Sequence, residues 1–169
     1  MVDVYLKNRN SVANYMRDNY GMDVYNGGDL SWYTGSKDTD DNQANYPAGR
    51  ALTAITGFPY LAYGPGVIGT SISASEVECR VKSTTDKNHA VIACGFSGDS
   101  GMSHMPNYPI GLDDGHWVAV DGYYYGDVWI VDPAASSNAL SYEWNNVSRY
   151  YRVSFEKFTA FIEYRGMLW

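Results

Sequence analysis

The chain has 169 residues, of which 45% are hydrophobic and 18% are charged, so it is long enough and apolar enough to bury a core. Its formal net charge of −7 repels phosphate backbones, and no cluster of Lys and Arg offers a local exception, which argues against nucleic acid as a partner. No apolar run approaches the roughly 20 residues that a membrane-spanning helix needs.

The first half of the chain carries three helical patterns. Apolar side chains recur at helical spacing in the first pattern. Pro47 suits the first turn of the second helix, and Gly57 closes it. Ser73 and Glu76 have the spacing of a capping box at the start of the third. The predicted helices are residues 10–21, 47–55 and 73–81.

The second half reads as strands followed by one helix. A short aromatic strand comes first, and a buried apolar strand follows it after the third helix. Two further strands lie on either side of a glycine- and tyrosine-rich turn, and a closing helix starts at Ser154 with a weak cap. These elements are strands 58–63, 89–96, 116–121 and 128–132, and helix 154–164. Helices first and strands later predict a single α+β domain over residues 1–169.

The two strands around the tyrosines predict a hairpin with a polar pair at its open end. If Gly122 faces Gly126, every opposed pair is apolar except the last. The pairs are then Val120 with Val128, Val118 with Ile130, and His116 with Asp132. Opposed Cβ atoms lie roughly 4.5–5.5 Å apart, so the carboxylate can accept a hydrogen bond from the imidazole. Asp132 would then orient His116 as a general base.

A second register is compatible with the same residues. A two-residue turn at Gly126 and Asp127 would move Asp132 opposite Asp121 and separate it from His116. A structural explanation also exists for each residue alone, because Asp followed by Pro commonly ends a strand. The residues themselves leave these alternatives open.

The residues around the pair resemble a known family. Residues 115–123 (Gly-His-Trp-Val-Ala-Val-Asp-Gly-Tyr) and 128–133 (Val-Trp-Ile-Val-Asp-Pro) are similar to the ending of papain-like cysteine peptidases related to the bacteriocin double-glycine leader peptidases. The resemblance extends from about residue 47 to 169. It implies a papain-like fold, with N-terminal helices packed on a C-terminal antiparallel sheet. It also implies that His116 is the general base, that Asp132 orients it, and that the substrate is a peptide or protein.

The resemblance carries further expectations about setting. The chemistry needs no cofactor and no metal. His104, Asp113, Asp114 and His116 could gather around an ion, but no fixed spacing joins them. The secreted bacterial relatives of this family imply an extracellular or cell-surface protein.

The chain departs from the family at the nucleophile. The family uses a Cys at the start of an early helix, whereas the first Cys here is Cys79. Cys94 lies on the strand expected beside the histidine strand and is the remaining candidate, although it lacks the helix N-terminus that activates a thiol. The sequence therefore predicts a peptidase-type domain that needs an upstream segment or another domain for its nucleophile.

A non-catalytic domain on the same scaffold is the alternative. The turn between the two strands holds Tyr123, Tyr124 and Tyr125, with Trp129 nearby. Aromatic side chains of this kind line clefts that bind peptides or glycans. In this hypothesis the tyrosines are the substrate-binding or ligand-binding residues, and no nucleophile is required.

Overall fold

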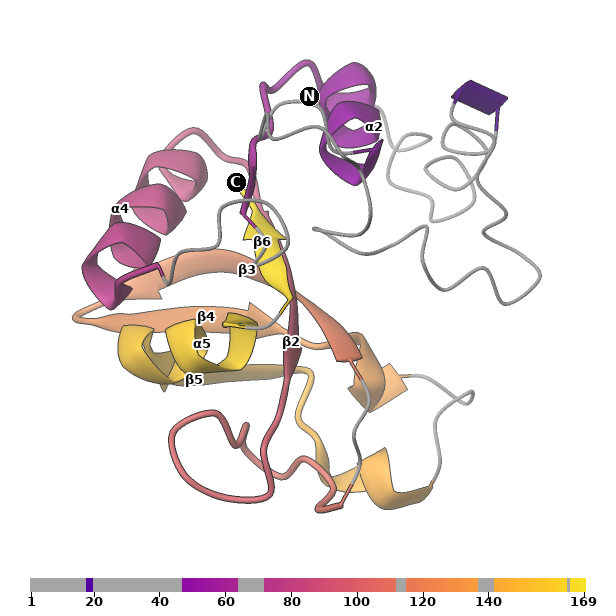
Figure 1. Ribbon diagram of the computed structural model, residues 1–169, viewed down its shortest axis with the longest axis vertical. Helices are drawn as coiled ribbons and strands as arrows, with labels where there is room; N and C mark the ends of the chain where they lie inside the picture. The colour runs from indigo at the N-terminus through magenta and orange to yellow at the C-terminus, as the bar shows by residue number, and fades with distance from the viewer. Residues whose placement is uncertain (1–17, 20–46, 64–71, 112–114, 137–141, 164) are drawn as a thin grey trace.

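The computed structural model describes residues 18–19, 47–63, 72–111, 115–136, 142–163 and 165–169 (Figure 1). Three α-helices and one antiparallel six-stranded sheet, in the order β1-β6-β2-β3-β4-β5, make up this part of the chain and confirm the α+β class. The helices are α2 (Pro47–Thr56), α4 (Ala74–Thr85) and α5 (Phe155–Ile162). The strands are β1 (Ala62–Tyr63), β2 (Val91–Phe96), β3 (Gly115–Tyr124), β4 (Asp127–Val131), β5 (Tyr150–Ser154) and β6 (Gly166–Leu168).

Helices α4 and α5 pack side by side on one face of this sheet (Figure 1). Alternate residues of β2, β3 and β4 point toward the helices and are almost completely buried, as the period of a strand requires. This inward set is Val91, Ala93, Val118, Val120, Val128 and Ile130. Gly95 continues it without a side chain, because a Cβ there would lie 2.3 Å from the carbonyl oxygen of Phe161 in α5. The helix therefore sits directly on the strand at this point.

The predicted helices from residue 47 onward are confirmed. The Ser73 side chain accepts the N–H of Glu76 at 3.2 Å, and α4 continues to Thr85, four residues beyond the predicted end. Ser154 caps α5 in the same way through the N–H of Lys157, also at 3.2 Å. Apart from two helical residues, 18 and 19, the predicted helix at residues 10–21 lies outside the described residues.

Two strands were not predicted. β5 was not identified from the sequence, and β6 was missed because that strand has only three residues. β6 lies between β1 and β2 in the sheet, so the end of the chain is an interior strand. The predicted strand at 58–63 is reduced to Ala62–Tyr63. The prediction of helices first and strands later was too simple, since α5 follows five of the six strands in sequence.

The turn between β3 and β4 is tighter than predicted. Tyr124 pairs with Asp127, so the turn itself consists of Tyr125 and Gly126. Both turn residues have positive φ angles, 45° and 88°, as a type I′ hairpin turn requires. This turn twists in the same sense as the flanking strands, which explains why it replaces the longer tyrosine loop.

A β-bulge in β3 determines which side chains of the hairpin share a face. The ladder shifts at Asp121, beyond which Val120 pairs with Ile130. The predicted register was therefore wrong by two residues, and the alternative pairing of Asp121 with Asp132 is not formed either. An even shift leaves every side chain on its predicted face, whereas an odd shift exchanges the faces. The bulge thus keeps His116 and Asp132 on the same side of the sheet.

Candidate functional site

His116 and Asp132 meet at one end of the hairpin. His116 is the second residue of β3, and Asp132 directly follows β4. Continuing the ladder by one residue places Asp132 beside Val118, so the two side chains meet diagonally across the strands. Nε2 of the imidazole lies 2.7 Å from Oδ1 of the carboxylate. The contact predicted from the sequence is therefore present, although the register that predicted it was wrong.

The local sequence fixes the Asp132 carboxylate from its own side. Pro133 begins a 3-10 turn, η4 (Pro133–Ser136), and Asp132 caps this turn by accepting the N–H of Ala134 on Oδ1 at 2.9 Å. The Asp132 N–H donates to the carbonyl of Arg149 at 2.9 Å. The Asp-Pro pair thus ends the strand, as the structural explanation predicts, and it also aims the carboxylate at His116.

Two tyrosines bind the other carboxylate oxygen. Tyr108, from the segment between β2 and β3, donates its hydroxyl to Oδ2 of Asp132 at 2.5 Å. Tyr151, from β5, donates to the same oxygen at 2.9 Å and lies 3.2 Å from the Tyr108 hydroxyl. Burial raises the pKa of both phenols above its ordinary value, so they remain neutral donors at physiological pH.

Asp132 is a fully buried anion that its partners compensate. Its side chain is 0% exposed. Burial alone raises the pKa of a carboxyl group, but the hydrogen bond and charge of His116, then the hydrogen bonds of Tyr108 and the Ala134 N–H, outweigh burial here. The net effect is a pKa for Asp132 below its ordinary value. The carboxylate is therefore ionised at neutral pH and accepts four hydrogen bonds.

Aromatic rings enclose the His116 imidazole. The Trp144 ring lies tilted against it with centroids 4.8 Å apart, and Tyr108 meets it edge to face at 5.4 Å. The His116 side chain is 12% exposed. Nε2–H donates a hydrogen bond to the carboxylate, so the lone pair of a neutral imidazole lies on Nδ1. Within the described residues, Nδ1 has no hydrogen-bond partner, which leaves it available as a base.

The structure does not bring Cys94 to His116. Cys94 pairs with Trp117, while His116 pairs with Gly95, so the two side chains point to opposite faces of the sheet. Burial raises the pKa of Cys94 to about 12, against a smaller lowering by the charge of Arg165. A thiol that is neutral and faces away from the base cannot be its nucleophile. The assignment of Cys94 as a catalytic residue is therefore corrected.

The three predicted binding tyrosines lie far from the dyad. Tyr123 lies seven positions beyond His116 along β3, about 23 Å at the usual rise of a strand. Tyr123 donates its hydroxyl to Asp86 at 3.0 Å, near the end of α4. Tyr124 and Tyr125 are exposed and contact one another at the turn. These side chains form no shared site with the base.

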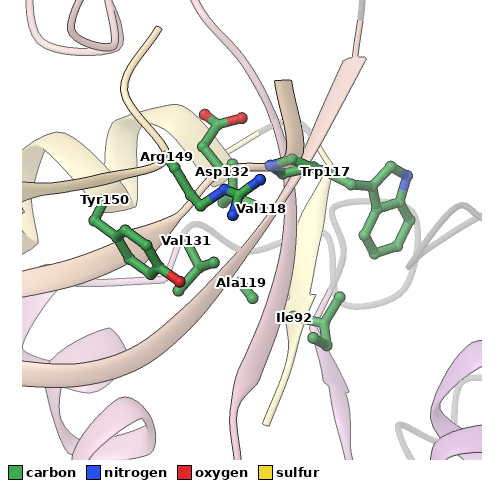
Figure 2. A pocket seen from close by; sticks show the side chains of 9 residues that line it. Ile92, Trp117, Val118, Ala119, Val131, Asp132, Arg149 and Tyr150 are labelled. Carbon is green, nitrogen blue, oxygen red and sulfur yellow. The ribbon is translucent and has the colours of Figure 1, made fainter. Parts of the chain in front are cut away.

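A hollow lies on the sheet face opposite the helices. Its volume is about 410 Å³, and its lining includes Ala119 and Val131 on the sheet. Figure 2 shows Trp117 on one side of it and Tyr150 with Arg149 on the other. No described residue forms a hydrogen bond or ion pair with the Arg149 guanidinium. Asp132 is also one of the residues that line the hollow. Its side chain is 0% exposed, and the alternation of strand side chains directs the carboxylate to the other face.

Two remaining questions from the sequence are whether side chains gather to bind a metal ion and whether a helix could cross a membrane. Nδ1 of His104 lies 2.6 Å from the Gly98 carbonyl, and Asp113 and Asp114 lie outside the described residues. Across the described ranges, no three His, Cys, Asp or Glu side chains are grouped to hold a metal ion. In the same part of the chain, no helix combines the length and the apolar character needed to cross a membrane.

Comparisons with known proteins add no relatives. No protein-family model matches the chain, and neither a curated protein nor a solved structure matches it. The site must therefore be interpreted from its own geometry.

Sequence reasoning missed three aromatic residues around the dyad. Tyr151 had a usable signal, because Tyr151, Val153 and Phe155 alternate inward as a strand requires. Tyr108 and Trp144 had none, since Tyr108 lies in a loop and Trp144 in a short 3-10 helix, and the local sequence does not specify where either segment lies. Their role becomes visible only when the fold brings their segments to Asp132 and His116.

Proposed function

We propose that this chain supplies the general base and orienting acid of a papain-like cysteine peptidase, with His116 as the base and Asp132 as the acid. The observation that carries the proposal is the 2.7 Å contact between Nε2 and Oδ1, in which a buried carboxylate holds an imidazole by one nitrogen. A buried anion without such a partner would be costly. The arrangement leaves the second nitrogen basic and oriented.

The reaction would be acyl transfer to a thiol. Nδ1 of His116 takes the thiol proton as the thiolate attacks the peptide carbonyl, and it then gives that proton to the departing amine. Water hydrolyses the resulting thioester with His116 again acting as base. Asp132 holds the ring and stabilises the imidazolium that forms in each half of the reaction, without taking up the proton itself.

The attacking thiol would come from outside the printed sequence. The chain contains two cysteines. Cys94 faces away from the base, and Cys79 lies exposed on helix α4. We therefore place the nucleophile on an adjoining segment or a partner, whose thiol would approach Nδ1. An extracellular or cell-surface setting remains part of this proposal.

The test is peptide cleavage by the protein together with any segment encoded beside it. New termini in a peptide mixture are identified by mass spectrometry for the wild type, His116→Ala and the matched control Asp121→Ala. Loss of the base should lower the cleavage rate about 10³-fold or more, since triad members act as a unit. The control removes an exposed carboxylate at the bulge and should cleave normally. Unchanged cleavage by His116→Ala would refute the proposal.

The hollow on the opposite face favours a second candidate, a peptide-binding module. Its aromatic sides and the guanidinium of Arg149 suit an extended peptide that carries a carboxylate. Such a ligand would not touch His116. Peptides with a free C-terminus and their amidated forms can be titrated by calorimetry, with Trp117→Ala as the test variant and Trp129→Ala as the control. Binding lost in the first variant alone would support this candidate, and equal binding in both would exclude the hollow.

A further inference from the structure

The two oxygens of the Asp132 carboxylate accept hydrogen bonds from different kinds of donor. Oδ1 receives His116 Nε2 and the Ala134 N–H, whereas Oδ2 receives the hydroxyls of Tyr108 and Tyr151. A single cap and a single histidine would satisfy only one oxygen. Without the phenols, Oδ2 would be a buried anionic oxygen with no partner.

The donors come from separate parts of the fold. Tyr108 lies between β2 and β3, and Tyr151 belongs to β5 at the edge of the sheet. The Ala134 N–H lies in η4. The donors approach from three different elements, so together they restrict the rotation of the carboxylate from several directions. A carboxylate turns easily about its terminal torsion when nothing holds it.

Phenol hydroxyls also withdraw charge from the carboxylate. A hydrogen bond to the ionised form favours that form, and both phenols are buried enough to stay protonated. The titratable groups that face the carboxylate are His116 from β3, Tyr108 from the connecting segment and Tyr151 from β5.

We propose that Tyr108 and Tyr151 are positioning residues that act on His116 through Asp132. By occupying Oδ2, they reserve Oδ1 for the imidazole and keep the carboxylate ionised as the solution becomes acidic. The pH below which Asp132 no longer holds His116 as an anion is then set by this pair of phenols. The meaning for catalysis rests on the proposed function, while the effect on Asp132 does not.

The experiment follows the ionisation of Asp132 by the ¹³C shift of its carboxyl carbon. The proteins are the wild type, Tyr151→Phe, the double variant with Tyr108→Phe, and the control Tyr123→Phe. Phenylalanine keeps the ring and removes only the donor. Tyr123 loses a hydroxyl bonded to Asp86 at the far end of β3, so it reports any general effect of a lost phenol.

Each lost phenol should lower the ionisation constant of Asp132 about five- to tenfold, because a hydrogen bond to the ionised carboxylate is stronger than one to the neutral acid by roughly this factor. The titration then moves to higher pH in Tyr151→Phe and further in the double variant, with no change in the control. An unchanged Asp132 titration in Tyr151→Phe would overturn the inference. Tyr151 is only partly buried, so this single variant gives an answer even if the double variant does not fold.

Cleavage measurements separate this inference from the proposed function. If peptide cleavage occurs, the acidic limb of the kcat/KM profile should move to higher pH in Tyr151→Phe, because an Asp132 that protonates at higher pH stops orienting His116 at higher pH. A phenol that serves only packing or stability would leave that limb in place. A shifted titration in a protein that cleaves no peptide even with its adjoining segment present would support the positioning role and refute the proposed reaction.

Discussion

Replacing Asp132 with Ala should cost a large part of the stability of this domain. The change leaves four donors without their acceptor: Nε2 of His116, the Ala134 N–H, and the hydroxyls of Tyr108 and Tyr151. Each unsatisfied buried donor costs about 1–3 kcal/mol. The sum is an overestimate, because the two phenols can bond to each other and the histidine is 12% exposed.

The removal of a buried charge offsets another part of the cost. Breaking a buried, hydrogen-bonded charge pair from one side usually costs about 3–5 kcal/mol, and we expect Asp132→Ala to fall in that range. Domains of this kind have about 5–15 kcal/mol in total. The free energy of unfolding would be measured by urea denaturation at pH 7, with an unchanged m-value showing that the same surface unfolds. Asp121→Ala, at the exposed bulge, should stay within about 0.5 kcal/mol of the wild type.

The pH dependence gives the same prediction a second check. The pKa of Asp132 is lower in the folded chain than the ordinary value of 3.8. Its carboxylate therefore contributes stability that is fully present above the unfolded pKa and is lost as the pH falls through the folded pKa. The gap in stability between wild type and Asp132→Ala should narrow as the pH falls below about 4. A loss under about 1 kcal/mol at pH 7, where even one unsatisfied donor costs that much, or a gap that does not narrow below about pH 4, would refute the reasoning.

Three further predictions concern the rest of the fold. Native protein treated with iodoacetamide at pH 6 and 8 should be modified on exposed Cys79 and not on buried Cys94, as peptide mapping would show; rapid modification of Cys94 would contradict its placement. Gly95→Ala should destabilise by about 3 kcal/mol or more in thermal unfolding, since the new Cβ meets the backbone of Phe161. Tyr125→Asn should stabilise by roughly 0.5–1 kcal/mol by the same measurement, because asparagine tolerates the φ of 45°, and a loss of stability would argue against the type I′ turn.

Local signals in the sequence predicted much of the described fold. The capping residues Ser73 and Ser154 begin helices α4 and α5, and the apolar run before Phe96 is strand β2. These features depend on neighbours within a few residues, which a single sequence displays directly. The hairpin register depends instead on a type I′ turn formed by Tyr125 and on a bulge that no residue type marks.

The candidate site was predictable only in part, for the same reason. His116 and Asp132 each continue the apolar alternation of one hairpin strand, so matching the two apolar faces placed them on the same side. Tyr108 and Tyr151 reach the site through the topology of the whole sheet, and β5 was not predicted at all. The error over Cys94 arose because nearness in the sheet was considered without its face. His116 pairs with Gly95, so the alternation of side chains along β2 places Cys94 on the opposite face from His116.

The most direct test of the dyad is the position of the proton on His116. The ¹⁵N spectrum of histidine-labelled protein distinguishes the two ring nitrogens, and the chain has only three histidines to assign. At a pH where the imidazole is neutral, the account predicts a proton on Nε2 and a lone pair on Nδ1, a pattern that Asp132→Ala should abolish. A proton on Nδ1 in the wild type, or the same spectrum in wild type and variant, would contradict the assignment of His116 as a base oriented by Asp132.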